Sequence, residues 1–282
     1  MPADRAALGA FLRSRRDRLT PAQAGIAAFP GARRVPGLRK EELAVLAGLS
    51  PDYYSRLEQG RQANVSGEVL DALAHALRLK DTEHAHLRDL AAPIRRQRPG
   101  TREAEQRPDP GLLRLLDTLD HVPVLLLGRR GDVLARNRLL QAVLGRPLEP
   151  GSSFVRYLLQ DPQARQWIVN WADFASVMVA GLRREAGRRP DDARLAALIG
   201  ELRSSDPDVA RWWDDHAVRD YASVAKRIAH PTAGMLHFDI EIVAAPHEPD
   251  QFLIVYTAQV DSPTARLLPL LGSWTVPSTS VR

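Results

Sequence analysis

The sequence predicts two domains, an all-α domain followed by an α+β domain. The chain has 282 residues, which is more than one typical domain contains. Its N-terminal part shows helical patterns of apolar residues only, whereas its C-terminal part adds runs rich in β-branched and aromatic residues. A segment rich in Pro, Arg and Glu separates them. We therefore predict an all-α domain over 1–92, a linker over 93–111, an α+β domain over 112–272 and a flexible tail over 273–282.

The composition is typical of a soluble globular protein. Hydrophobic residues make up 44% of the chain and charged residues 26%. The absence of cysteine excludes disulfides, thiolate metal sites and thiol nucleophiles, and agrees with a reducing compartment. The N-terminus lacks the apolar core of a secretory signal, and no apolar run approaches the roughly 18 residues of a membrane span. We expect a cytoplasmic protein that does not enter a membrane.

The positive charge is concentrated at the front of the chain. Residues 1–110 hold 19 Lys and Arg against 14 Asp and Glu, whereas residues 111–282 hold 20 of each kind. Residues 1–61 alone hold 11 against 6, which accounts for the whole net charge of +5. A basic first domain beside a neutral second one indicates that the first domain binds a polyanion.

The first domain is predicted to contain five helices. The first spans 5–18, where apolar residues recur at helical spacing among arginines. The Gly- and Pro-rich segment 20–37 favours a loop or small hairpin, with Arg33 and Arg34 at its rim. Four more helices are expected within 38–49, 50–59, 66–79 and 81–92, with capping residues such as Ser50, Ser66 and Asp81. Such a set makes a compact helical domain.

The segment 40–59 meets the requirements of two short helices that pack across a tight turn. Gly48 permits the turn, and the inward positions are apolar: Leu43, Ala47, Leu49, Tyr54 and Leu57. This pattern indicates a helix-turn-helix motif, whose second helix enters the major groove of double-stranded DNA. Glu58 also faces inward, and because a buried carboxylate needs a partner, we predict that it pairs with Arg16.

The outer face of the second helix carries the candidate base-reading residues. Arg56 suits a guanine, and Asp52 suits a cytosine or orients Arg56. The candidates for base or wall contacts are Asp52, Tyr53, Ser55, Arg56 and Gln59, and those for phosphates are Arg39, Lys40, Ser50 and Arg61. Arg33 and Arg34, at the rim of the loop, are further candidates for DNA contact. For each residue taken alone, the alternative is a solvated surface side chain.

The second domain is predicted to combine an antiparallel sheet with inserted helices. Two short strands flank a turn within 122–137, and a helix follows over 137–144. Residues 160–220 show helical patterns, including one aromatic stripe that begins at Trp167. Three further strands are expected within 221–230, 235–245 and 251–260. Helices therefore lie between two early strands and three late ones.

Polar residues flanked by apolar sequence are candidates for orienting the head of a small ligand. They are Asn137, Arg227 and His230, and the candidate apolar lining is Trp167, Trp171, Phe174 and Met178. The alternatives are that Asn137 caps a helix, that His230 is a structural histidine, and that the aromatic stripe packs a solid core.

Catalytic and metal-binding patterns are missing from the sequence. His84 and His86 are two residues apart, which points them to different sides of a helix, and there is no HExxH motif. Asp214, Asp215 and His216 are adjacent in sequence and do not converge on a helix. There is no GxSxG elbow, P-loop or dinucleotide fingerprint. We expect no enzyme activity, metal or cofactor.

Several stretches of the chain resemble a known family. The run "GARRVPGLRKEELAVLAGLSPDYYSRLEQGR" is similar to the DNA-binding domain of Xre-type helix-turn-helix regulators, in particular the MmyB-like transcription regulators common in actinomycetes. In the second domain "VLARN", "DPQARQWIVNWADFASVMVAGLR", "PDDARLAALIGELRSSDP" and "HPTAGML" resemble the ligand-binding half of that family. The resemblance extends from about Leu8 to Leu271.

The resemblance implies a PAS-like sensor domain that binds a fatty acid or a similar lipophilic small molecule. It also implies a homodimer and a role in regulating secondary metabolism. The family usually has an aromatic residue before the asparagine of the second strand, where this chain has Arg136. We expect a ligand-responsive, sequence-specific transcription regulator. The alternative is a DNA-binding regulator whose second domain only dimerises or recruits a protein partner.

Overall fold

The computed structural model describes residues 3–31, 33, 35–62, 64–91, 106–215 and 225–273. The described chain forms two compact units. The first unit draws on Met1–Arg98, Val179–Glu201 and Ala210–Asp220, and the second on Pro99–Met178, Leu202–Val209 and Tyr221–Arg282. Most of the predicted linker and nearly all of the predicted tail lie outside the described residues. The predicted domain boundaries stay a prediction.

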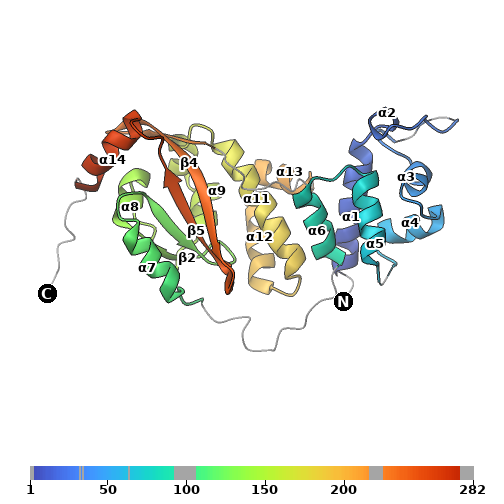
Figure 1. Ribbon diagram of the computed structural model, residues 1–282, viewed down its shortest axis with the longest axis horizontal. Helices are drawn as coiled ribbons and strands as arrows, with labels where there is room; N and C mark the ends of the chain where they lie inside the picture. The colour runs from blue at the N-terminus through green and yellow to red at the C-terminus, as the bar shows by residue number, and fades with distance from the viewer. Residues whose placement is uncertain are drawn as a thin grey trace. The chain divides into compact units, whose positions relative to one another are not determined.

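The N-terminal part of the first unit is helical, as predicted (Figure 1). Its core contains Leu8, Phe11 and Leu12, which follow one another at helical spacing along the first helix and are almost fully buried. Short helices of this kind depend on such burial, because few of them would be stable alone. The helices are α1 (Ala3–Arg18), α2 (Pro21–Ala24), α3 (Lys40–Leu46), α4 (Pro51–Glu58), α5 (Gly67–Ala76) and α6 (Asp81–Ala91).

Helix α2 corrects the prediction of five helices, since it forms a single turn in the segment expected to be loop or hairpin. The Thr20 hydroxyl accepts a hydrogen bond from the backbone N–H of Gln23, and the Gln23 side chain accepts one from the backbone N–H of Thr20. Pro21 takes the first helical position, and Gly25 ends the turn at a φ of 81°. These residues satisfy the hydrogen-bonding groups at both ends of the turn. A helix of four residues is too short to produce a periodic pattern of apolar residues in the sequence.

The turn between α3 and α4 has the predicted form. Gly48 adopts a φ of +66°, a left-handed conformation that glycine enters without steric cost. The Ser50 hydroxyl accepts a hydrogen bond of 3.1 Å from the backbone N–H of Tyr53, and Pro51 is the first residue of α4. Helix α4 therefore begins where the sequence predicts.

The second unit contains a five-stranded antiparallel sheet in the order β2-β1-β5-β4-β3, which confirms the predicted PAS-like arrangement (Figure 1). The strands are β1 (Val124–Leu127), β2 (Val133–Arg136), β3 (Lys226–His230), β4 (Gly234–Ala245) and β5 (Glu248–Thr257). Because β1 pairs with β5, strands far apart in sequence form the middle of the sheet. Helices α7 (Pro110–Thr118) and α8 (Arg138–Leu144) pack against β1.

The inserted helices lie in sequence between β2 and β3. After α8 they are α9 (Phe154–Gln160), α10 (Pro162–Trp167), α11 (Trp171–Arg188), α12 (Ala193–Ser205) and α13 (Pro207–Asp214), and α14 (Pro263–Ser273) follows the sheet. Helices α11, α12 and α13 each contribute residues to both units. Within the residues that the structure describes, no helix is long and apolar enough to cross a membrane.

The predicted aromatic stripe does not lie on a single helix. Trp167 ends α10 and Trp171 begins α11, because the chain leaves the helical conformation at Ile168. There Ile168 forms an isolated antiparallel bridge with Ile228, and the backbone N–H of Val169 donates to the carbonyl of Arg227 at 2.9 Å. Pairing with a strand thus overrides the helical spacing of the sequence.

Candidate DNA-binding and ligand-binding sites

Helix α4 presents the predicted base-reading pair on its exposed face. Asp52 and Arg56 form an (i, i+4) ion pair of 3.3 Å, and their side chains are 80% and 51% exposed. An exposed pair of this kind contributes little to stability. It does restrict the rotamers of Arg56, so the guanidinium is held near the middle of the face that a groove would meet.

The other predicted residues of α4 surround this pair. Gln59 donates from its side-chain amide to the Ser55 hydroxyl at 3.2 Å, which orders two neighbouring polar groups on the same helix. Tyr53 is half-buried and packs partly against the core. Arg61 is exposed just beyond Gly60, and Ser50 caps the helix with its hydroxyl oxygen. The structure therefore brings these six residues together around one exposed helix: Asp52, Tyr53, Ser55, Arg56, Gln59 and Arg61.

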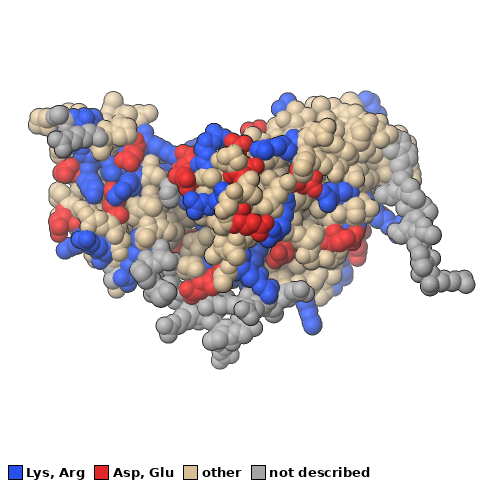
Figure 2. Space-filling model, turned by 180° about the vertical axis from the view of Figure 1, so that it is seen from behind, with Lys and Arg blue, Asp and Glu red and all other residues tan. Residues whose placement is uncertain are grey.

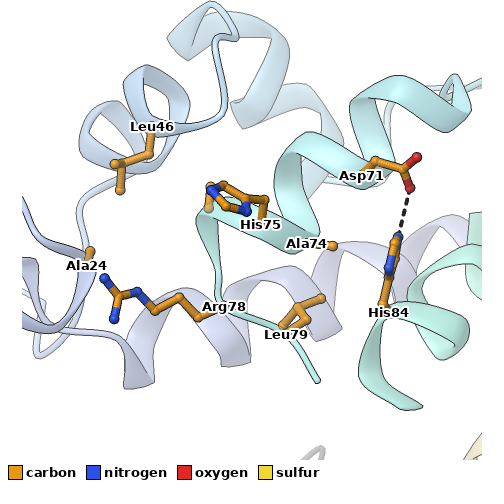
Figure 3. Close-up of a pocket in the computed structure, with 9 residues that line it drawn as sticks. Ala24, Leu46, Asp71, Ala74, His75, Arg78, Leu79 and His84 are labelled. Atoms are coloured by element: carbon orange, nitrogen blue, oxygen red, sulfur yellow. Dashed lines mark hydrogen bonds and ion pairs between the residues drawn. The ribbon is translucent and has the colours of Figure 1, made fainter. Parts of the chain in front are cut away.

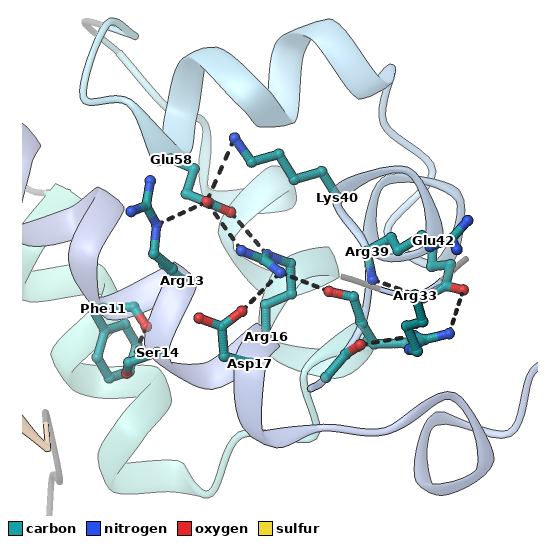
Figure 4. A network of polar contacts seen from close by, with 12 residues as sticks. Phe11, Arg13, Ser14, Arg16, Asp17, Arg33, Arg39, Lys40, Glu42 and Glu58 are labelled. Carbon is teal, nitrogen blue, oxygen red and sulfur yellow. Dashed lines mark hydrogen bonds and ion pairs between the residues drawn. The ribbon is translucent and has the colours of Figure 1, made fainter. Parts of the chain in front are cut away.

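A buried carboxylate at the end of α4 ties it to α1 and α3 (Figure 4). The Glu58 side chain is fully buried and accepts hydrogen bonds from Arg16 at 2.9 and 3.2 Å, as predicted. It also accepts one from Arg13 Nε at 3.0 Å, and Lys40 Nζ lies 3.6 Å away. Burial by itself would raise the pKa of Glu58, but the bonds from Arg16 hold it below its usual value. Glu58 is therefore a charged anchor for the recognition helix.

Glycine allows α1 and α4 to meet backbone to backbone. A Cβ atom at Gly9 would lie 2.2 Å from the carbonyl oxygen of Glu58, closer than atoms approach in proteins. The sequence analysis overlooked Gly9, although a glycine inside a predicted helix is a signal of close packing.

A second buried carboxylate binds the side chain of Arg33 and the backbone of Arg39, two residues predicted to contact DNA. Glu42 is fully buried and bonds to Arg33 Nη2 at 2.7 Å and to the backbone N–H of Arg39 at 2.7 Å. Arg33 also donates to the carbonyl of Gly37 at 2.7 Å. Burial would raise the pKa of Glu42, but these donors, Arg33 first, lower it. The guanidinium of Arg33 thus binds Glu42 and Gly37 within the protein, and its contact with DNA stays a prediction.

The remaining residues predicted to contact DNA differ in the bonds that they make within the protein. The Arg39 guanidinium donates to the carbonyls of Pro30 and Gly31 at 3.0 and 2.7 Å, so it holds the loop before α3. Lys40 is half-buried beside Glu58 at the start of α3. Arg34 lies outside the described residues. Arg39 is bound in this way because backbone carbonyls of the preceding loop need hydrogen-bond donors and lie within reach of its long side chain.

The first unit also has a surface groove of about 610 Å³ between residues of α2, α3, α5 and α6 (Figure 3). Its polar side chains include Asp71 and His84, whose atoms lie 2.8 Å apart, and Arg88 bonds to the same carboxylate at 2.7 Å. Asp71, His84 and Arg88 thus bond within the protein, and His75 and Arg78 also line the groove.

In the second unit, Asn137 caps α8 and joins it to β1. Its side-chain oxygen accepts from the backbone N–H of Leu140 at 3.0 Å and of Val124 at 3.2 Å. Its amide donates to the carbonyls of Leu119 and Val122 at 3.0 and 2.6 Å. These four bonds use the whole hydrogen-bonding capacity of the side chain. The structure therefore favours the capping alternative over contact with a ligand head group.

His230 also has structural partners. Its Nδ1 accepts from the backbone N–H groups of Thr232 and Ala233 at 3.2 and 3.0 Å, and its Nε2 lies 3.1 Å from the carbonyl of Ala142. Trp167 packs edge-on against the imidazole with ring centres 5.6 Å apart. This arrangement favours the structural alternative, with the proton on Nε2.

Arg227 faces away from the interior of the second unit. Residues of β3 alternate between buried and exposed, so Arg227 is exposed while Lys226 and Ile228 are buried. The prediction paired Arg227 with His230, but positions three apart on a strand lie on opposite faces. Arg227 is therefore wrongly placed among the residues of an internal pocket.

The predicted apolar lining is partly confirmed as interior. Trp171 and Met178 are buried, and the Trp171 indole donates to the carbonyl of Leu158 at 2.6 Å. Phe174 is half-buried, and its ring centre lies 4.9 Å from the Nζ atom of Lys226. Arg136, at the position where the family has an aromatic residue, donates to the carbonyl of Leu148 at 3.0 Å and pairs with Glu149.

Lys226 is a polar residue of β3 that faces the interior of the second unit, and the sequence analysis missed it. Its side chain is 2% exposed, its Nζ lies 3.0 Å from the Tyr256 hydroxyl, and burial lowers its pKa to about 7. The ring of Phe154 lies 5.7 Å from the same nitrogen. The alternation in "KRIAH" contains the signal, since it places the lysine on the same face as Ile228.

A surface cavity of about 430 Å³ lies beside this cluster in the second unit. Tyr157 lines the cavity, and its ring also packs against Phe154 with centres 5.8 Å apart. Arg146 and Arg156 line the cavity too, and the Arg146 guanidinium lies 5.6 Å from the centre of the Tyr157 ring. Asp161 also lines the cavity and pairs with Arg146. Tyr157 lies at the cavity and packs against Phe154, one of the rings around Lys226.

Charged side chains of both signs are interspersed on the face shown in Figure 2, without one extended field of a single sign. Among the residues that the structure describes, no group of three or more His, Cys, Asp or Glu is placed to hold a metal ion.

Comparison with known protein families agrees with this geometry. A model of a helix-turn-helix domain matches residues 7–87, and a model of the MmyB-like transcription regulator ligand binding domain matches residues 108–271. The comparison with curated proteins finds no match. The second match covers more than half of the chain and the first contains α3, α4 and the residues around Arg56. The chain is therefore a DNA-binding transcription regulator and belongs to the MmyB-like family.

Proposed function

We propose that the protein binds a specific double-stranded operator as a homodimer in the cytoplasm, and that a lipophilic small molecule, such as a fatty acid, modulates this binding. In the DNA-bound dimer each copy places α4 in the major groove, with half-sites about 34 Å or a multiple of this distance apart. Arg56 supplies the base contact, because its guanidinium is exposed and held by Asp52.

Comparison of two arginines tests the DNA contact. Arg56→Ala should cost about 1 to 3 kcal/mol on an operator selected from random DNA and less on unrelated DNA. Arg61→Ala is the matched control, since Arg61 is exposed beside the same helix and suits a phosphate. It should weaken binding to both DNAs alike. Equal losses for Arg56→Ala on both DNAs would refute base reading by Arg56.

The observation that supports an internal ligand is Lys226. A lysine amine surrounded by Phe154, Phe174 and Tyr256 is unusual in a solid protein core, where charged groups are paired. A family of ligand-binding domains provides the context for this polar group. A cluster of aromatic rings around one amine matches a lipophilic molecule with a polar head group.

Thermodynamic linkage between the DNA-binding site and the ligand-binding site tests whether the ligand modulates DNA binding. If ligand changes the affinity for operator, operator must change the affinity for ligand by the same factor. Native mass spectrometry of the purified protein should show a retained lipid, or binding of an added one, and its affinity should differ with and without operator. Equal affinities would refute modulation. Failure of every lipid to bind would favour the alternative that the second unit only dimerises or recruits a partner.

A further inference from the structure

Lys226 is a basic group without an acidic partner. Within the described part of the second unit, its polar contact is the Tyr256 hydroxyl, 3.0 Å from Nζ, and no carboxylate forms an ion pair with it. The centres of the Phe174 and Tyr256 rings each lie 4.9 Å from Nζ, and that of Phe154 lies 5.7 Å away. The amine therefore keeps donors that its surroundings do not use.

A purely structural role does not account for this arrangement. Ammonium groups are among those that cost most to bury, and a Met, whose unbranched side chain is nearly as long, would fill most of the same space without that cost. On the opposite face of the same strand, Arg227 keeps its charge in solvent. The inward placement of Lys226 thus lowers the stability of the folded protein, a cost that is offset when a ligand neutralises the charge.

We propose that Lys226 is the counter-ion for the acidic head group of the ligand, so that the second unit selects lipophilic acids over neutral lipids. This proposal rests on the proposed function, in which that unit binds a lipophilic molecule. The acidic head lies against Nζ and the Tyr256 hydroxyl, and the hydrocarbon chain lies among the aromatic rings. Tyr157 lines the 430 Å³ surface cavity and packs against Phe154, so this cavity is the proposed point of entry for the ligand.

Binding of an acid at Lys226 should depend on pH, because the amine takes up a proton when the acid binds. The titratable groups that face the amine are Tyr256 of β5 and, behind it, Tyr157 of α9, and burial raises the pKa of both, that of Tyr157 to about 12. Both tyrosines therefore stay neutral between pH 7 and 9.5. Over this range the free amine loses its proton, because burial lowers its pKa to about 7. Binding of a carboxylate then takes up one proton, and affinity falls about tenfold per pH unit.

The experiment compares dodecanoic acid, methyl dodecanoate and dodecan-1-ol by isothermal titration calorimetry on the full chain. The acid should bind at least about tenfold more tightly than either neutral probe at pH 7, since a charge-assisted bond is worth that factor. Its affinity should fall with pH, whereas that of the ester should not. Lys226→Met should abolish both the preference and the pH slope. Arg227→Met, the matched control on the exposed face of β3, should retain both.

Each other outcome overturns the proposal in a distinguishable way. Equal binding of acid and ester by the natural chain would refute selection by Lys226 and leave the proposed function intact. A preference that survives in Lys226→Met would assign it to another cation, such as Arg146 or Arg156 of the cavity. Failure of acids and esters of every chain length from about 8 to 18 carbons to bind would refute the proposed function as well. The pH slope of the natural chain tests the proposal even if Lys226→Met does not fold.

Discussion

Replacing Glu58 with Gln removes the negative charge at the centre of the first unit while preserving the size of the side chain. The carboxylate is fully buried and its main partner, Arg16, is 5% exposed. After the change Arg16 retains the partly exposed Asp17, 2.8 Å away, but loses its buried anion, and Arg13 loses an acceptor as well. Removal of one partner from a buried ion pair costs about 3 to 5 kcal/mol. Domains are stable by only about 5 to 15 kcal/mol, so this loss is large.

The assay is thermal unfolding of the full chain, followed by circular dichroism and by tryptophan fluorescence in parallel. Of the five tryptophans, Trp212 and Trp213 belong to the first unit, and Trp167 and Trp171 belong to the second, so a loss of helix accompanied by only part of the change in fluorescence reports unfolding of the first unit. A loss of 3 kcal/mol or more should lower the midpoint of that transition by at least about 12 °C, at about 4 °C per kcal/mol for a domain of this size.

Asp52→Asn is the matched control for this measurement. It also removes one carboxylate of an ion pair on α4, but Asp52 is 80% exposed and its partner Arg56 is 51% exposed. Such a pair is worth about 1 kcal/mol or less. A midpoint for Glu58→Gln no lower than that for Asp52→Asn would refute the assignment of Glu58 as the anchor of the recognition helix.

Three further predictions follow from the same contacts. The pKa values of Glu58 and Glu42 are lowered in the folded state, so the stability that these carboxylates contribute is present above about pH 4.3 and is lost as pH falls through their folded values. The unfolding free energy of Glu58→Gln, measured between about pH 5 and pH 2, should therefore depend less on pH than that of the natural chain. Lys226 has a folded pKa of about 7, below its unfolded value near 10.4, so the unfolded chain binds more protons between them. The unfolding free energy, measured with urea from pH 7 to 9.5, should therefore rise by up to about 1.4 kcal/mol per pH unit, and this rise should be missing in Lys226→Met. Gly9→Ala places a Cβ 2.2 Å from the Glu58 carbonyl oxygen and should destabilise the domain by about 1 to 3 kcal/mol and weaken operator binding, whereas Gly67→Ala, at the start of α5 with open space around it, should do neither.

Local rules were sufficient for the DNA-binding motif. Ser50, Pro51 and Gly48 mark the start of α4 and the turn before it through interactions within a few residues, and the structure shows the same boundaries. The (i, i+4) spacing of Asp52 and Arg56 also places them together on one face. Even the distant bond between Glu58 and Arg16 could be predicted, because an inward carboxylate requires a cation and α1 is rich in arginine.

Contacts between distant segments decided the rest. The sequence alone does not show that Arg33 is used by Glu42, that Gly9 meets the backbone of α4, or that Ile228 interrupts the aromatic stripe at Ile168, because these partners come from other elements. The placement of Lys226 was implicit in strand alternation, yet only the sheet shows which face is interior and that Tyr256 is its partner. The sequence by itself determined caps, turns and helix faces, since these depend on neighbours three or four residues away. The tertiary structure decided which polar groups bond within the fold and that Lys226 faces the interior, because burial and pairing depend on long-range packing.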